Sequence, residues 1–124
     1  MLKARDVMTD NVITIKPDIH LKDAIRILIG KEISGVPVVD DSNNVVGILS
    51  EKDIINYMFS GNLSASVVSE AMTKNIISMT SDTDLDNVAL LISEKKIRRI
   101  PIIDNGKLVG IISRRDIIRS MLEA

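Results

Sequence analysis

The chain has 124 residues, of which 45% are hydrophobic and 2% aromatic; it contains no cysteine and has a formal net charge of −1 at pH 7. It is long enough to form a core without disulfides, while the missing cysteine excludes thiolate metal sites and the near-zero charge gives no general attraction to nucleic acid or anionic lipid. No apolar run reaches the roughly 18 residues of a membrane helix, and the N-terminus lacks the apolar stretch of a secretion signal, so we expect a single cytoplasmic module without membrane contact.

Both halves of the chain predict the same order of elements. In the first half a short lead-in helix is followed by a strand, a helix, two strands and a second helix. The predicted strands are β-branched or continuous apolar runs, and the predicted helices have apolar residues at helical spacing. These elements begin, in order, at residues 3, 12, 21, 36, 45 and 51. The mixture predicts an α/β (α+β) fold.

Polar residues and prolines mark the boundaries of these elements. Asp18 precedes the first long helix at an N-cap position, as Asp82 does in the second half. Ser50 is expected to cap the helix that follows the predicted hairpin. Pro37 and Pro101 lie inside predicted strands, where proline belongs at an edge because it has no N–H to donate.

Two groups of apolar residues are expected to lie in the core. The helix after Ser50 should carry Ile54, Ile55 and Met58 inward. The methionines that recur at matching places are expected to pack there as well, namely Met8, Met58, Met72 and Met121.

The chain is an internal repeat. Val7 matches Ala71 at an offset of 64, and Ser50 matches Ser113 at an offset of 63. The residue that is lost between them falls in a polar turn, where a hairpin tolerates a change of length. We therefore predict two copies, residues 1–62 and 63–124.

Both copies contain the motif Gly-x-x-Ser-x-x-Asp, which begins at Gly47 and at Gly110. A Met-Thr opening and an apolar-Pro-apolar strand precede it in each copy. With these motifs in this order, nearly the whole chain resembles the cystathionine-β-synthase (CBS) domain, arranged in tandem as a Bateman module. The resemblance implies two pseudo-twofold related repeats, each a small three-stranded sheet with two helices.

The resemblance also implies a function. Tandem CBS domains bind adenosine-containing ligands, so we expect AMP, ADP or ATP, or S-adenosylmethionine, as a regulatory ligand, with no required cofactor. The motif aspartates, Asp53 and Asp116, would bind ribose hydroxyls, because a carboxylate accepts strong hydrogen bonds from a pair of hydroxyls. Ser50 and Ser113 would contact phosphate. Arg99 stands where the family often carries a phosphate-binding arginine, and Arg98 and Arg115 are further candidates.

By the same resemblance, each cleft is shared between the copies. Asp116 and Ser113 would face residues of the first copy, namely Val12, Ile13, Gly35 and Val36. Asp53 and Ser50 would face residues of the second copy, namely Ile76, Ile77, Arg99 and Ile100. We expect the cleft that contains Arg99 to prefer the more highly charged nucleotide.

The residues alone leave simpler roles open. The two aspartates could stabilise helix N-termini as first-turn carboxylates, and the two serines could be N-caps. The single histidine, His20, has no metal ligands at suitable spacing, and no nucleophile has a candidate base. We therefore expect neither a metal nor catalysis.

Two rival functions stay open. A structural homodimerisation module with empty clefts would associate through exposed apolar residues such as Ile55, Tyr57, Met58 and Phe59. Nucleic-acid binding through the arginines near residues 98 and 114 is disfavoured by a pI of about 5.8 and by the scarcity of aromatic residues. The regulatory function, in which the module senses an adenosine-containing ligand, also predicts a homodimer. It further predicts a separate effector protein on which the module acts in trans.

Overall fold

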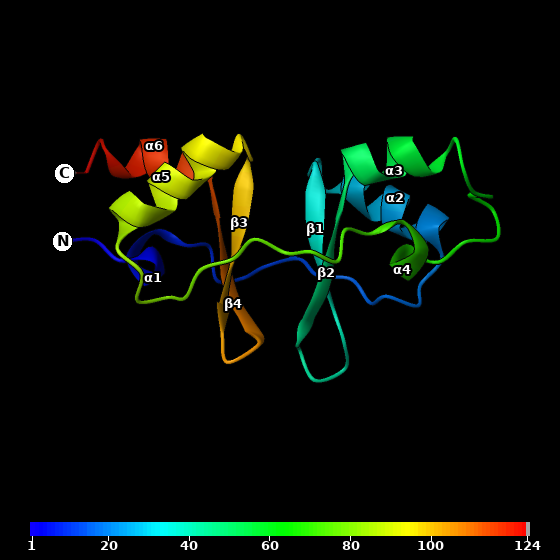
Figure 1. Ribbon diagram of the computed structural model, residues 1–124, viewed down its shortest axis with the longest axis horizontal. Helices are drawn as coiled ribbons and strands as arrows, with labels where there is room; N and C mark the ends of the chain where they lie inside the picture. The colour runs from blue at the N-terminus through cyan, green and yellow to red at the C-terminus, as the bar shows by residue number, and fades with distance from the viewer. Residues whose placement is uncertain (124) are drawn as a thin grey trace. The chain divides into compact units, whose positions relative to one another are not determined.

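The computed structural model describes residues 1–123; Ala124, the last residue of the predicted second repeat, lies outside them. Helices and strands follow in the order helix, helix, strand, strand, helix, and this order occurs twice, which confirms the predicted α+β repeat (Figure 1). The elements are α1 Ala4–Val7, α2 Leu21–Gly30, β1 Gly35–Val39, β2 Val45–Ser50, α3 Glu51–Tyr57, α4 Val68–Ala71, α5 Leu85–Lys95, β3 Arg99–Asp104, β4 Lys107–Ser113 and α6 Arg114–Ser120. The two hairpins, β1–β2 and β3–β4, are antiparallel as predicted.

The compact units of the structure differ from the halves of the sequence. Unit 1 consists of Met1–Val12 and Ile77–Ala124, and unit 2 of Ile13–Ile76. The lead-in helix α1 therefore belongs to the unit of α5, β3, β4 and α6, whereas α4 belongs to the unit of α2, β1, β2 and α3. Each lead-in helix thus contributes to a unit whose hairpin comes from the other half of the chain.

Each unit has its own aliphatic core, to which the lead-in helix contributes one fully buried residue. In unit 1 this residue is Ala4, and in unit 2 it is Val68. The remaining core residues come from the long helix and the hairpin, with the last helix added in unit 1 and the bridge residue Ile15 added in unit 2. They are Leu85, Val88, Ile92, Ile100, Ile102, Ile112 and Ile117 in unit 1, and Ile15, Leu21, Ala24, Leu28, Val36, Val38 and Leu49 in unit 2.

The third strand predicted for each sheet is wrong, because each sheet has two strands. Of the predicted strand at residues 12–15, only Ile15 pairs with β1: its N–H donates to the carbonyl of Pro37 at 3.1 Å, and its carbonyl accepts from Val39 at 2.9 Å. Continuing this parallel ladder to Ile13 would need an N–H at position 37, which proline lacks. Pro101 limits the equivalent bridge, that of Met79 in unit 1, in the same way.

The N-cap predicted for α2 is also wrong. The helix begins after His20 instead of Asp18, and no side chain of the cap bonds its first turn. The first N–H of the helix, that of Leu21, donates to the carbonyl of Ser66 at 2.9 Å. The segment that leads into α4 therefore satisfies this donor, and a capping side chain is not needed.

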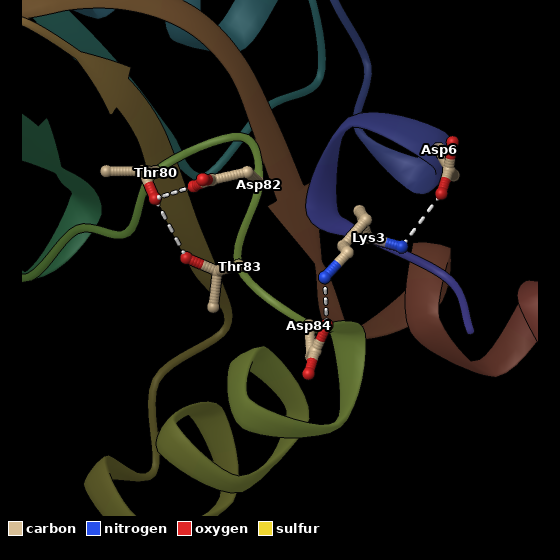
Figure 2. A network of polar contacts seen from close by, with 6 residues as sticks. All are labelled: Lys3, Asp6, Thr80, Asp82, Thr83 and Asp84. Carbon is tan, nitrogen blue, oxygen red and sulfur yellow. Dashed lines mark hydrogen bonds and ion pairs between the residues drawn. The ribbon is translucent and has the colours of Figure 1, made fainter.

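The start of α5 in unit 1 repeats this arrangement. Its N-cap is Asp84 instead of Asp82, and the first N–H of the helix donates to the carbonyl of Leu2 at 2.9 Å. Figure 2 shows that Lys3 reaches from the lead-in segment to Asp84, with 2.5 Å between Nζ and Oδ1, while Asp82 accepts from Thr80 at 2.6 Å. Lys3 and Asp84 thus hold α1 against α5.

The recurring methionines separate into two groups. Met8 and Met72 pack against the cores as predicted. Met58 and Met121 are 54% and 67% exposed, so the prediction that they lie in the core is wrong. The same holds for Ile55, which is 55% exposed.

Met8 and Met72 explain the two motif glycines. A Cβ on Gly110 would stand 2.5 Å from Sδ of Met8 and 3.1 Å from its Cβ; a Cβ on Gly47 would stand 2.5 Å from Sδ of Met72. These distances are shorter than van der Waals contact. The strand can therefore pass the end of each lead-in helix only where it lacks a side chain.

We expect Gly110→Ala to lower the free energy of unfolding by about 1–3 kcal/mol, the usual cost of overpacking a core. Gly30→Ala is the matched control, because a Cβ there has no neighbour within 4 Å. The control should leave stability unchanged or raise it slightly. Urea denaturation of the three proteins measures both effects, and equal stability of the two variants would contradict the packing explanation.

Asp104, at the end of β3, fixes the segment before α5. Its carboxylate accepts hydrogen bonds from the hydroxyl of Ser81 at 2.6 Å and from the Ser81 N–H at 2.9 Å. These bonds, helped by the charge of Arg5, hold the pKa of Asp104 below its usual value. The carboxylate therefore stabilises the folded state fully above the unfolded pKa of about 4, and this stabilisation is lost as the pH falls through the lowered folded pKa.

Asp104→Asn should accordingly be less stable than the parent at pH 7, and the difference should shrink as the pH falls below about 4. Urea denaturation at pH 7 and at pH 3 measures it. Asp10→Asn, which changes an exposed aspartate, is the control for the loss of one charge. A stability difference that does not change with pH would show that the carboxylate charge has no part in it.

Candidate functional site

In each unit the Gly-x-x-Ser-x-x-Asp motif forms the junction between a strand and a helix. Ser50 ends β2 and is the N-cap of α3, and Ser113 ends β4 and is the N-cap of α6. Asp53 and Asp116 lie in the first turn of these helices. A serine followed three residues later by an acidic residue is the spacing of a capping box, so the sequence itself brings hydroxyl and carboxylate together.

In unit 2 three hydrogen bonds join Ser50 and Asp53. The Asp53 N–H donates to Ser50 Oγ at 3.2 Å, and the Ser50 N–H and hydroxyl each donate to Asp53 Oδ2 at 2.9 Å. The other carboxylate oxygen, Oδ1, accepts from the hydroxyl of Thr73 at 2.7 Å. The backbone of Thr73 pairs with Ile48 on β2, which brings its side chain to the motif.

In unit 1 the capping box is the same, but a cation meets the second oxygen. The Asp116 N–H donates to Ser113 Oγ at 3.1 Å, and the Ser113 N–H donates to Asp116 Oδ2 at 2.8 Å. Oδ1 lies 3.5 Å from Nη1 of Arg119, a residue whose counterpart in the first copy is Asn56. The Asp116 side chain is 13% exposed and that of Arg119 62%.

The simpler roles that the sequence left open are therefore present in both units: the serines are N-caps and the aspartates are first-turn carboxylates. In each case one carboxylate oxygen belongs to the capping box, and the other is met by an exposed side chain. A hydroxyl of a ligand could replace Thr73 or Arg119 at that oxygen without disturbing the helix start.

Three further predicted residues lie at the same end of the β3–β4 hairpin as the motif of unit 1. Arg99 opens β3 and is the cross-strand partner of Ser113, as Gly35 is of Ser50 in unit 2. Arg98 is exposed, and its carbonyl accepts from the N–H of Arg114 at 2.9 Å. Arg115, exposed in the first turn of α6, completes a basic group around Ser113 and Asp116.

The predicted apolar site residues divide by burial. Val36 and Ile100 are fully buried in their cores and Gly35 is buried, so a ligand could meet them mainly through the backbone. The other four, which are half-buried or exposed, are Val12, Ile13, Ile76 and Ile77. Unit 1 holds Val12, Ile77 and Ile100, and unit 2 holds Ile13, Gly35, Val36 and Ile76. The clefts shared between the copies stay a prediction.

Sequence reasoning missed Thr73 and Arg119. Thr73 was visible as part of the repeated Met-Thr opening, and Arg119 as the residue one turn after Asp116. Within residues 1–123, no group of three or more His, Asp or Glu side chains could hold a metal ion. No helix of this part of the chain has both the length and the apolar character needed to cross a bilayer.

Comparison with known proteins places this geometry among described folds. A protein-family model of the CBS domain matches the chain twice, at residues 4–60 and 68–123. The crystal structure of CBSX2 from Arabidopsis thaliana in complex with AMP is 31% identical and superposes with a TM-score of 0.91 over 99% of this chain and 98% of that one. The CBS domain pair of protein MJ0100, in complex with 5′-methylthioadenosine and S-adenosyl-L-methionine, is 29% identical, with a TM-score of 0.85 over 99% of this chain and 98% of that one.

Longer proteins contain similar segments. Inosine-5′-monophosphate dehydrogenase of Aquifex aeolicus is 37% identical over 119 residues, which are 94% of this chain and 24% of the dehydrogenase. The chain likewise spans 41% of the length of protein MJ1225 of Methanocaldococcus jannaschii.

Proposed function

The chain belongs to the CBS domain family, with two CBS domains in tandem as a Bateman module, and we propose that it is a regulatory module that binds an adenosine-containing ligand without catalysis. The observation that carries the proposal is the Ser–Asp pair at the start of α3 and of α6, where a half-buried carboxylate keeps one oxygen outside the capping box. The AMP in CBSX2 and the adenosine compounds in MJ0100 support this class of ligand. We favour AMP, ADP or ATP over S-adenosylmethionine.

The proposed contacts follow from the chemistry of the ligand. The Oδ1 atoms of Asp53 and Asp116 would accept from ribose hydroxyls, in place of the bonds from Thr73 and Arg119. A hydrogen bond from a ribose hydroxyl to an ionised carboxylate is about twice as strong as a neutral one. The net gain is smaller than one such bond, because the bonds from Thr73 and Arg119 that it replaces also end on the carboxylate. Ser50 and Ser113, each beside its aspartate, would contact phosphate.

The two sites should differ in their preference for charge. Arg98 precedes β3 and Arg99 opens it, whereas Ser34 and Gly35 occupy these positions in unit 2. An arginine can hold a phosphate through two parallel hydrogen bonds, which serine and glycine cannot do. We therefore propose that Arg99, assisted by Arg98 and Arg115, makes one site prefer nucleotides with more phosphates.

The side chains at the motif support a role without catalysis. The hydroxyl of Ser50 donates to Asp53, and both motif serines accept from a backbone N–H, so they serve helix capping. The only histidine, His20, lies before α2 and pairs with Val67. A nucleophilic serine needs a base that takes its proton. Asp53 accepts from the Ser50 hydroxyl, but with the same oxygen that accepts from the Ser50 N–H, so we propose that this carboxylate caps the helix and does not activate the serine.

Calorimetry and thermal unfolding test the proposal. Protein stripped of copurified ligand is titrated with AMP, ADP, ATP, NAD and S-adenosylmethionine, with GMP as the control for the base. A site with a Kd near 10 μM, filled at 1 mM, should stabilise the fold by about 2.7 kcal/mol, which raises the Tm by several degrees. If none of the adenosine ligands changes the Tm at millimolar concentration, the sensory function is wrong.

A second candidate function, a structural homodimerisation module, is favoured by exposed apolar side chains. Ile55, Met58 and Phe59 near the end of α3 are 55%, 54% and 80% exposed. The prediction that Tyr57 belongs to this exposed set is wrong, because it is half-buried and its hydroxyl bonds Ser66 at 2.6 Å. We propose that the chain forms a homodimer whether or not a nucleotide is bound. That the module acts in trans on a separate effector protein stays a prediction.

A further inference from the structure

Met8 and Met72 occupy equivalent places in the two copies of the repeat, one at the end of each lead-in helix. Met8 is the C-cap of α1, and its N–H donates to the carbonyl of Ala4 at 2.9 Å. Met72 is the C-cap of α4, and its N–H donates to the carbonyl of Val68 at 3.0 Å. Ala4 and Val68 are the fully buried residues of these helices. Each methionine thus stands where a lead-in helix ends beside the core of its unit.

The sulfur of each methionine lies against the motif glycine of a strand. A Cβ on Gly110 would stand 2.5 Å from Sδ of Met8, and a Cβ on Gly47 would stand 2.5 Å from Sδ of Met72. Neither unit therefore has space for one further atom between the sulfur and the strand. Both methionine side chains are only half-buried, so part of each stays open to a small solute.

Backbone hydrogen bonds next to these methionines hold the lead-in segments to the hairpins. Thr9 exchanges two with Ile111 on β4, both at 2.9 Å, and Thr73 exchanges two with Ile48 on β2, at 2.8 and 2.9 Å. In unit 2 the hydroxyl of Thr73 also donates to Asp53 at 2.7 Å. The four N–H groups of these bridges are already in use, so they are not free to pair with a new acceptor at either sulfur.

A thioether at these places is open to oxidation by hydrogen peroxide, which converts methionine to its sulfoxide. A lone pair of Sδ attacks one peroxide oxygen, the O–O bond breaks, and the leaving hydroxide takes the proton of the transferred oxygen to form water. The sulfur is oxidised by two electrons, and the peroxide is reduced by the same two. The product carries a polar oxygen on the atom that lies against the glycine, and burying such an acceptor without a donor is unfavourable.

We propose that Met8 and Met72 form a reversible redox switch, in which oxidation to the sulfoxide loosens each lead-in segment from its hairpin. The new oxygen has no room against the motif glycine and no free donor in the bridges, so the segment moves away. In unit 2 this movement withdraws Thr73 from Asp53, which carries the oxidation to the motif. The switch needs no bound ligand and does not depend on the proposed function.

Peptide mass spectrometry after peroxide treatment of the folded protein tests the site of modification. One added oxygen is expected on Met8 and on Met72. The exposed Met58 and Met121 should gain one as well, and they report that the treatment was effective. If both exposed methionines are oxidised while Met8 and Met72 stay reduced, the proposal is wrong.

Amide hydrogen exchange, followed by NMR before and after the treatment, tests the loosening. The N–H groups of the two bridges, those of Thr9, Ile48, Thr73 and Ile111, should each lose protection by about tenfold or more. The controls are Ile33 and Ile97, which donate to the carbonyls of Leu28 and Ile92 at the ends of the long helices and should keep their protection. No loss at the bridges would overturn the switch, and so would an equal loss at bridges and controls, which indicates general unfolding.

Leucine variants separate the switch from oxidation elsewhere in the chain. Met8→Leu/Met72→Leu keeps about the same side-chain volume without sulfur, so it should fold like the parent and keep its Tm in peroxide. Met58→Leu/Met121→Leu is the matched control and should lose several degrees of Tm in peroxide, as the parent does. Met1 and Met79 are present in all three proteins. A loss of Tm in Met8→Leu/Met72→Leu equal to that of the parent would contradict the proposal.

Reduction of the oxidised protein tests reversibility. Methionine sulfoxide reductases for both sulfoxide epimers, supplied with a dithiol, return the thioether and yield water and a disulfide. Amide protection at the bridges and the Tm should then recover to the values of the untreated protein. If the added oxygen is removed from Met8 and Met72 and protection does not return, oxidation damages the fold and does not switch it.

Discussion

Asp116→Ala should raise the Kd of adenosine, AMP and ATP alike, by tenfold or more, at the site to which Asp116 belongs. All three ligands carry the ribose, and net hydrogen bonds to a charged group contribute about 1.5–3 kcal/mol, where about 1.4 kcal/mol is a factor of ten in Kd. Asp53→Ala should have the same effect at the other site. Calorimetry with the three ligands measures both.

A control is needed because the aspartates also belong to capping boxes. Loss of the capping-box hydrogen bonds should lower the free energy of unfolding by about 0.5–2 kcal/mol, whether or not the aspartate binds a ligand. Ser113→Ala removes the cap of α6 but leaves the carboxylate of Asp116, so it should lose stability and keep its affinity for adenosine. If Asp116→Ala loses the same stability as Ser113→Ala and binds adenosine as the parent does, Asp116 is only a helix-capping residue.

Arg99→Ala should raise the Kd of ADP and of ATP by tenfold or more and leave the Kd of adenosine nearly unchanged. The guanidinium would contact phosphate, which adenosine lacks, and a forked contact to a charged group is worth about 1.5–3 kcal/mol. Arg99→Lys should recover only part of the loss, because lysine keeps the charge without the planar fork. An ATP affinity within a factor of two of the parent would remove this role from Arg99.

Arg119→Ala is the matched control, since it removes an exposed arginine of the same unit that bonds Asp116 at 3.5 Å. Arg119→Ala should change the affinities for ATP and for adenosine by the same factor. Arg119 contacts the carboxylate of Asp116, where the ribose would bind in its place, and it has no proposed contact with phosphate. Double variants then show which aspartate acts with Arg99. Non-additive losses of Arg99→Ala with Asp116→Ala would place the two side chains at one site, and coupling with Asp53→Ala would assign Arg99 to the other motif.

Local sequence signals determined much of this fold. The spacing of apolar residues predicted the helices, the continuous apolar runs predicted both hairpins, and Ser50 and Ser113 are the N-caps that the sequence suggested. Each of these signals acts within one helical turn or one hairpin, so it does not depend on where the rest of the chain goes. The same local chemistry brings each motif serine to its aspartate.

The tertiary structure decided the features that depend on distant partners. Leu21 is capped by Ser66, and Lys3 bonds Asp84 across 81 residues, so neither helix start could be located from its own neighbours. The predicted third strand does not form, because the register of Ile15 against β1 would require a hydrogen bond from the backbone N–H of residue 37, and this residue is a proline. The register is defined only when the two segments meet in the folded chain. The partner of Asp53, Thr73, reaches it because the backbone of Thr73 pairs with Ile48 on β2.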